Sequence, residues 1–290
     1  MQDIQALLAA AKNTPTFQAT GVTDVVAVRD IQPLVDRYEA YGFAVARSDD
    51  DSPAALAALA AALDLGEPFV PPLYRFGGRD APAIARISAA ANADTEAASH
   101  PSFGKTNGQR FHTDGTLQDI GEVRSSMLLC ATPAAQGGVT TLFNATGAYA
   151  RLLADDEEAA LALATPGSLV RQANINGCTN ANHGPAFGVL DGELATRYAI
   201  TDTDSWAVPP RVSADALWRG VRYLDRASQP GSEFYLDLRL GAGQLILLAN
   251  ARICHGRTPY EDSATHRRCM FRSLHLRRPR VAASTAAQAP

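Results

Sequence analysis

Two stretches far apart in the sequence carry side chains that bind metal ions. Residues 110–116 read RFHTDGT, in which His112 and Asp114 are two positions apart, and residues 247–260 read LLANARICHGRTPY and contain His255. Two imidazoles and one carboxylate on a common face bind ferrous iron and leave its other coordination positions open. The same side chains would also suit zinc, which is the alternative at this point.

The metal-site prediction depends on both stretches. A lone His-x-Asp triplet more often forms a polar turn than a metal site. If His112 and Asp114 lie at a strand edge, their side chains point to the same side, and His255 completes the set when its strand lies alongside. The remaining histidines are expected to be ordinary surface or core residues: His100, His183, His266 and His275.

A second group of residues is suited to binding an anion. Arg268 and Arg272 are four positions apart in the strand-like segment RRCMFRSLHLR, so they share one face of it. A buried arginine holds a carboxylate through two parallel hydrogen bonds. Thr140 follows the pair Gly137-Gly138 in QGGVTTLFN, and its hydroxyl is available to the same anion.

Short strands are the main elements that must position these residues. Alternating or continuous apolar runs bounded by turn residues predict strands at 43–46, 83–88, 126–131, 139–143, 169–172, 186–190, 196–200, 234–238, 244–248 and 269–276. Helical spacing predicts helices at 1–12, 30–41, 53–63, 147–164 and 214–226. The pattern is typical of a mainly β protein with added helices and a jelly-roll core.

The composition limits the classes of protein to which the chain can belong. The chain has 290 residues, 46% of them hydrophobic and 19% charged, with a net charge of −4, which excludes the basic surface of a nucleic-acid binder. No apolar run is long enough to span a membrane, and the first residues lack the pattern of a secretory signal, so a cytoplasmic protein is expected. We expect one domain over 1–280, with 69–110 as a lid over the site and 281–290 as a disordered tail.

In order and spacing, these motifs resemble the Fe(II)/2-oxoglutarate-dependent dioxygenases of the taurine dioxygenase (TauD/TfdA-like) family. That family carries HTD, GG-x-T, an asparagine five residues before a histidine, and R-x-x-x-R. This chain has His112-Thr113-Asp114, Gly137-Gly138-Val139-Thr140, Asn250 before His255, and Arg268 before Arg272. The segments YGFAVAR and LAAALDLGEP extend the resemblance to residues 30–278.

The resemblance implies a double-stranded β-helix (jelly-roll, cupin-like) core and a role for each matched residue. His112, Asp114 and His255 would bind Fe(II). Arg268 would pair with the distal carboxylate of 2-oxoglutarate, assisted by Thr140.

Two further positions are implied to contact the substrate. Arg272 matches the position that meets an anionic substrate group in the taurine enzyme, and Asn107 lies in a segment that contacts substrate in relatives. Arg267 would take the role of Arg268 if the register differed by one residue.

The implied reaction oxidises an unactivated C–H bond of a small molecule, anionic or amino-acid-like, with release of succinate and CO2. Hydroxylation is the expected outcome and secondary metabolism the expected setting, while a desaturase or cyclase would use the same iron, 2-oxoglutarate and O2. Halogenation is not expected, since halogenases of this type lack the carboxylate ligand and Asp114 is present. The alternatives from other classes are a zinc-dependent hydrolase and a non-catalytic ligand-binding barrel.

Overall fold

Two β-sheets lie face to face and form the framework of the molecule. The computed structural model describes residues 3–75, 81–89, 105–173 and 177–281. The larger sheet contains, in order, β1 (Val25–Ala27), β2 (Phe43–Arg47), β14 (Gln244–Ala249), β5 (Ser125–Thr132), β17 (Cys269–His275) and β3 (Ala85–Ile87). The smaller sheet contains β13 (Tyr235–Leu238), β7 (Thr140–Phe143), β15 (Cys254–Arg257) and β4 (Gln109–His112).

The core between the sheets follows from the alternation of side chains along the strands. In β14, Ile246 and Leu248 join the cluster that also contains Leu142 of β7 and Leu238 of β13, so this face of β14 meets the smaller sheet. Leu245 and Leu247, on the opposite face of β14, pack in the cluster formed with the N-terminal helices. This strand is therefore apolar on both faces, as expected for a strand covered from both sides.

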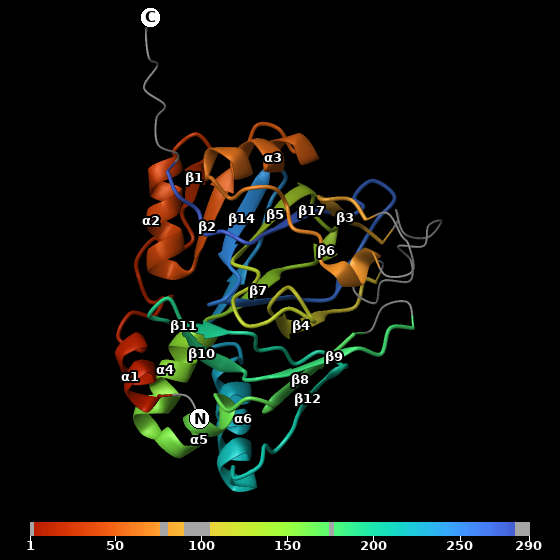
Figure 1. Cartoon of the computed structure of the whole chain (residues 1–290). Helices are drawn as coiled ribbons and strands as arrows, with labels where there is room; N and C mark the ends of the chain where they lie inside the picture. Colours follow the sequence, from red (N-terminus) through yellow and green to blue (C-terminus); the bar gives the residue numbers. More distant parts are fainter. Residues whose placement is uncertain (1–2, 76–80, 90–104, 174–176, 282–290) are drawn as a thin grey trace, which may run out of the picture.

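Helices α2 (Ile31–Tyr41) and α3 (Pro53–Ala62) cover the outer face of the larger sheet, where Figure 1 shows them beside β1 and β2. Gly42 ends α2 in the left-handed conformation, with φ of 75°. Pro53 occupies the first turn of α3, as expected, but the hydroxyl of Ser52 makes no capping hydrogen bond.

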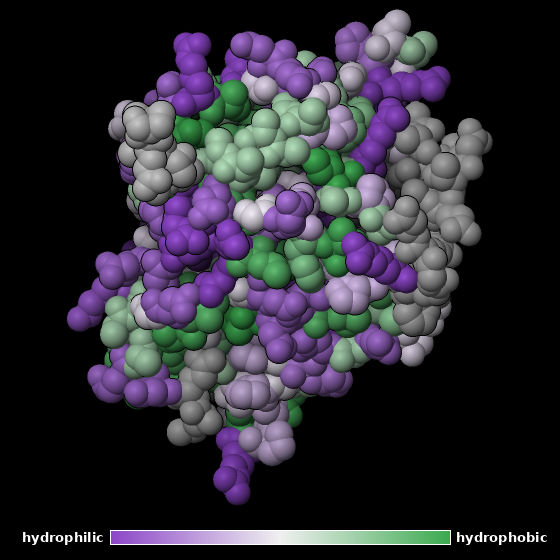
Figure 2. All heavy atoms as spheres, turned by 45° about the horizontal axis from the view of Figure 1, so that its top comes forward, coloured by the Kyte–Doolittle hydropathy of each residue, from purple (hydrophilic) through white to green (hydrophobic). Residues whose placement is uncertain are grey.

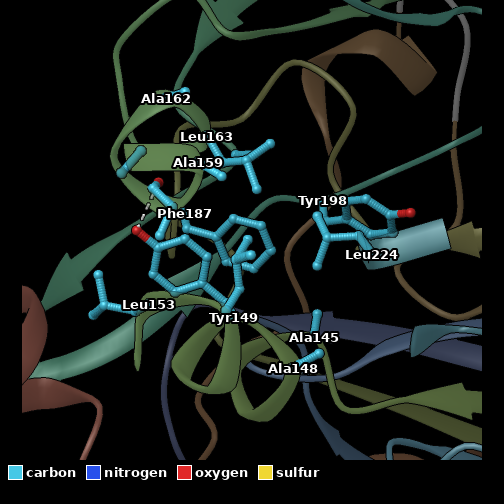
Figure 3. Packing of buried hydrophobic residues seen from close by; sticks show 14 of the residues in the cluster. Ala145, Ala148, Tyr149, Leu153, Ala159, Ala162, Leu163, Phe187, Tyr198 and Leu224 are labelled. Carbon is cyan, nitrogen blue, oxygen red and sulfur yellow. Dashed lines mark hydrogen bonds between the residues drawn. The ribbon is translucent and has the colours of Figure 1, made fainter. Parts of the chain in front are cut away.

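A second group of helices packs at the other end of the molecule (Figure 1). It comprises α1 (Ile4–Ala10), α4 (Ala145–Asp155), α5 (Glu157–Leu163) and α6 (Ala214–Ala227). The rings of Tyr149 and Phe187 stack there with centroids 4.2 Å apart, and the Tyr149 hydroxyl donates to the carbonyl of Ala160 (Figure 3). The single helix expected over 147–164 is wrong, because Asp156 interrupts it and caps α5 by accepting from the amide of Ala159.

Smaller ribbons complete the β structure: β8 (Leu169–Gln172) lies between β9 (Ala181–Gly184) and β12 (Asp204–Trp206), β10 (Phe187–Leu190) pairs with β11 (Glu193–Thr196), and β6 (Gln136–Gly137) pairs with β16 (Tyr260–Glu261). Asp191 and Gly192, whose φ angles are 53° and 79°, form the turn between β10 and β11. The strand expected over 196–200 is shifted, since β11 already ends at Thr196. The chain beyond it runs beside β4 through a bridge between His112 and Ala199.

The fold is the mainly β jelly-roll arrangement with added helices that the sequence predicts. On the face shown in Figure 2, hydrophilic and hydrophobic residues are interspersed. Within the described ranges, no helix has the length and apolar character needed to cross a membrane. The predicted lid over 69–110 is described in part, as η1 (Pro72–Arg75), β3 and β4, while residues 76–80 and 90–104 and most of the predicted tail lie outside the described residues.

Candidate metal and co-substrate site

Neighbouring strands of the smaller sheet bring together the three predicted metal ligands. His112 is the last residue of β4 and lies directly opposite His255 of β15 in the antiparallel register. Asp114 follows two residues after His112. One ligand atom from each of the three side chains lies within 4.8 Å of the others, and all three residues are buried. The pairing of β15 with β4 therefore brings His255 next to two residues that lie far from it in the sequence.

Asp114 is held through its backbone and its carboxylate by side chains from three strands or strand ends of the larger sheet. Asn250, just after β14, accepts a hydrogen bond from the Asp114 amide at 2.8 Å and donates to the Asp114 carbonyl at 3.1 Å. Ser126 of β5 donates to Oδ2 of Asp114 at 2.9 Å, and Arg272 of β17 donates to Oδ1 at 2.6 Å. These contacts hold the backbone and the carboxylate of Asp114 in place, and all of them come from the larger sheet.

Burial and charge set the protonation states of these three side chains. Burial lowers the pKa of His112 below its usual value and that of His255 to about 3, so both imidazoles are neutral near pH 7. Burial acts to raise the pKa of Asp114, but the guanidinium of Arg272 and the two imidazoles outweigh it and hold that pKa well below its usual range. Two neutral imidazoles and an ionised carboxylate are the forms that bind a divalent metal, so the donor set fits iron.

The tautomer of His112 is fixed by its backbone contact. Its Nδ1 lies 2.9 Å from the carbonyl oxygen of Arg110, which can only accept, so Nδ1 carries the proton. Nε2 is then the free donor atom on the side of the cluster. This is the arrangement that orients metal-binding histidines in proteins.

Arg171 of β8 holds the turn between the two ligands of the HTD motif. Its guanidinium donates to the Thr113 hydroxyl at 3.1 Å, to the Thr113 carbonyl at 3.0 Å and to the Gly115 carbonyl at 3.3 Å. Its Nε lies 3.5 Å from the carboxylate of Asp204, and both side chains are almost completely buried. Nothing in the local sequence around Arg171 indicates this role, because it depends on the packing of β8 beneath the turn.

Two of the predicted anion-binding residues, Arg268 and Thr140, are buried. Arg268 is 5% exposed, and its guanidinium lies over the ring of Tyr260 at 5.3 Å. The guanidinium of Arg257 lies over the same ring at 4.7 Å. Thr140 is buried and is the register partner of Arg257 across β7 and β15. The structure thus places Arg268 and Thr140 near a common pair, Arg257 and Tyr260, which sequence reasoning missed.

Among the described residues, no carboxylate pairs with either of these buried cations. Within the described parts of the chain, neither Arg257 nor Arg268 forms an ion pair. Burial lowers the pKa of Arg268 and lowers that of Arg257 to about 10, because the charged form of each side chain is removed from water. A buried guanidinium without a counterion is costly to maintain. A bound anion would remove that cost, so Arg257 and Arg268 are suited to binding a carboxylate.

The glycine pair before Thr140 is explained by the close approach of β16. Gly137 and Gly138 have φ of 68° and 64°, a region that favours glycine. A Cβ at Gly137 would lie 2.1 Å from the carbonyl oxygen of Pro259. The pair therefore lets the strand before Thr140 pass directly against the residue before Tyr260.

The two residues predicted to contact the substrate, Arg272 and Asn107, differ in burial. Arg272 is buried, and besides Asp114 its guanidinium donates to the Tyr74 hydroxyl at 3.0 Å. Asn107 is exposed, and its carbonyl oxygen accepts from Arg257 at 2.5 Å. Arg267 is exposed, in contrast to its buried neighbour Arg268.

Comparisons with known proteins agree with this geometry. The model of the family described as taurine catabolism dioxygenase TauD, TfdA family, matches residues 11–274. A uridine-5'-phosphate dioxygenase from Amycolatopsis sp is 39% identical over 254 residues, covering 86% of this chain and 90% of that protein. One from Streptomyces sp is 35% identical over 266 residues, covering 89% and 93%. The structure of an asparagine oxygenase with Fe(II), hydroxyasparagine and succinate has a TM-score of 0.58 at 15% identity, covering 94% of this chain and 90% of that one.

Proposed function

The chain belongs to the TauD/TfdA family of dioxygenases, and from this premise we propose that its substrate is a nucleoside 5'-phosphate, with uridine 5'-phosphate as the first candidate. The enzyme is an Fe(II)- and 2-oxoglutarate-dependent dioxygenase that uses O2 and acts on a small molecule. When bound, Fe(II) couples the oxidative decarboxylation of 2-oxoglutarate to the oxidation of a substrate C–H bond. The protein supplies the ligands, the anion pocket and the position of the substrate.

The observation that carries the proposed chemistry is the buried cluster of His112, Asp114 and His255, whose ligand atoms lie within 4.8 Å of one another. In this proposal these three side chains bind Fe(II). Arg268 binds the distal carboxylate of 2-oxoglutarate with help from the hydroxyl of Thr140. Two buried guanidinium groups without carboxylate partners in the described structure support that assignment.

The substrate class rests on the two relatives named uridine-5'-phosphate dioxygenase, which align with most of this chain. The anionic substrate expected from the sequence is consistent with a phosphate. We retain Arg272 and Asn107 as candidate substrate contacts, because Arg272 lies at the metal cluster and Asn107 precedes β4. We also propose that residues 1–280 act as one domain.

The test begins with purified protein loaded anaerobically with Fe(II). Adding 2-oxoglutarate should produce a broad visible charge-transfer band. After admission of O2, succinate release should rise at least tenfold with uridine 5'-phosphate over the release without substrate, and uridine, taurine and asparagine should have little effect. His255→Ala should abolish turnover, whereas His266→Ala, which alters an exposed histidine, should not. Equal succinate release with every compound would overturn the nucleotide assignment.

A further inference from the structure

A β-bulge lies where β4 meets β15, next to the metal ligands. His112 pairs with His255 and Gln109 pairs with Arg257, so three steps along β4 match two steps along β15. One extra residue in β4 shifts the alternation of its side chains. Bulges near active sites commonly re-aim a side chain in this way. Here the shift turns Gln109 toward the same side as His112, although an odd spacing would place them on opposite faces of a regular strand.

The side chain of Gln109 reaches the ligand atom of His112. The amide nitrogen of Gln109 lies 3.1 Å from Nε2 of His112. Because Nδ1 of His112 donates to the carbonyl of Arg110, Nε2 is an acceptor and the Gln109 amide is the donor. That hydrogen bond uses the lone pair that a metal ion needs. The imidazole is already oriented through Nδ1, so the Gln109 contact is not required to hold the ring.

The backbone around Gln109 is held in place by β15 and its neighbours. Arg257 donates to the carbonyl oxygens of Lys105 and Asn107, at 3.0 and 2.5 Å. A Cβ at Gly256 would lie 2.7 Å from the carbonyl oxygen of Gln109, so glycine permits the close approach of the two strands. The half-buried Gln109 therefore lies on an anchored stretch between Arg257 and the metal ligands.

We propose that Gln109 binds the co-substrate: with Nε2 of His112 occupied by a metal ion, the Gln109 amide would be free to donate to a carboxylate oxygen of 2-oxoglutarate. A carboxylate oxygen accepts hydrogen bonds, and the Gln109 amide is a donor that lies 3.1 Å from Nε2 of His112. This proposal rests on the Fe(II)/2-oxoglutarate activity and not on the identity of the substrate. It assigns the bulge in β4 a role in binding.

The experiment compares anaerobic Fe(II)-loaded wild type with Gln109→Ala, Gln109→Glu and Gln32→Ala. Gln32 is the matched control, since it is exposed on α2 and its side-chain amide donates to Asp36 of the same helix. The Kd of 2-oxoglutarate is measured from the charge-transfer band, and the Kd of Fe(II) is measured separately. No nucleotide is present, so failure of the nucleotide assignment leaves this test unaffected.

We expect Gln109→Ala to raise the Kd of 2-oxoglutarate about 3- to 10-fold, the effect of one hydrogen bond, and to shift the band, with the Kd of Fe(II) within about twofold of wild type. Gln109→Glu has nearly the same shape but places a carboxylate beside a carboxylate, so the Kd should rise more than about tenfold. Gln32→Ala should match wild type.

An unchanged Kd of 2-oxoglutarate and an unchanged band in both Gln109 variants would overturn the proposal. So would a loss of Fe(II) affinity with no separate effect on 2-oxoglutarate, because Gln109 would then support only His112. The absence of a band in wild type would instead overturn the co-substrate site as a whole, and this outcome is distinguishable from failure of the variants alone.

Discussion

At the scale of single residues, Asp114 and Arg272 form a buried charge pair within the site. Their side chains are 2% and 6% exposed, and Nη1 of Arg272 lies 2.6 Å from Oδ1 of Asp114. Charges removed from water in this way depend strongly on each other. The pair therefore affects the stability of the metal-free protein as well as the position of a metal ligand.

We expect Asp114→Asn and Arg272→Met each to lower the free energy of unfolding of the metal-free protein by about 3–5 kcal/mol, since each removes one charge of a buried ion pair and keeps the other. The double variant should be less destabilised than the sum of the two by at least about 2 kcal/mol. Urea denaturation in the presence of a chelator measures all four proteins. Additive effects would show that the pair is not coupled.

Arg171 is a second residue whose effect can be isolated, because it touches the turn of the HTD motif and no metal ligand side chain directly. Lysine at this position keeps the charge beside Asp204 but cannot make the three bonds to Thr113 and Gly115. Arg171→Lys should weaken Fe(II) binding about 10- to 100-fold, as for other residues that orient metal ligands. Anaerobic calorimetry measures the affinity.

Arg219→Lys is the control for that substitution. Arg219 contacts Asp156, Glu158 and Asp215 at the surface, in a separate group of charges. Its substitution should leave Fe(II) affinity unchanged. Wild-type affinity in Arg171→Lys would contradict the role of Arg171 in positioning the turn.

At the scale of elements, the ribbon of β6 and β16 connects Gly137 and Gly138 to Arg268, the residue predicted to bind the co-substrate carboxylate. Tyr260 of β16 pairs with Gly137 of β6, and the guanidinium groups of Arg257 and Arg268 both lie over its ring. A change in the ribbon should therefore alter the position of Tyr260. Two glycines with positive φ, only one of which has a close neighbour, allow the effect of this close approach to be measured apart from the effect of backbone strain.

Gly137→Ala should destabilise the protein and raise the Kd of 2-oxoglutarate severalfold. Gly192→Ala places alanine at a similar positive φ of 79°, but nothing within 4 Å would meet its Cβ, so only the strain of about 1–2 kcal/mol applies. Denaturation and the charge-transfer titration compare the two. Equal stabilities and equal Kd values would show that the contact with Pro259 is unimportant.

At the scale of the whole molecule, buried neutral histidines make stability depend on pH. His275 in β17 is 0% exposed, and burial lowers its pKa to about 4, while an unfolded histidine has a pKa of about 6.5. Between these values the unfolded state binds more protons than the folded state. Stability must therefore fall as the pH is lowered from 6.5 to 4.

The contribution of His275 to this loss is at most about 3 kcal/mol. His275→Gln should flatten the dependence of the free energy of unfolding on pH in this window by up to that amount. Metal-free wild type and variant are compared by urea denaturation at pH 7, 5.5 and 4.5. His255, with a pKa of about 3, also lowers the free energy of unfolding as the pH falls, and it does so in both wild type and variant. Parallel curves would contradict the role assigned to His275.

Much of the framework is readable from local pattern. The apolar alternation around β5, β14 and β17 predicts strands close to those observed, and the ligand atoms of His112, Asp114 and His255 lie close together. Local pattern fails where a polar side chain competes with its own backbone. Asp156 ends one helix and caps the next, although the apolar spacing continues through it.

The sequence by itself determined the ligand types, because these are properties of single residues and of short motifs, but it did not predict β4 and β15, the strands that carry His112 and His255. Only the tertiary structure decided what surrounds those ligands. Arg272 meets Asp114, Arg171 meets Thr113, and Gln109 meets His112 only once strands distant in the chain have paired. A one-residue bulge changes which face a side chain occupies, and no local pattern specifies that register.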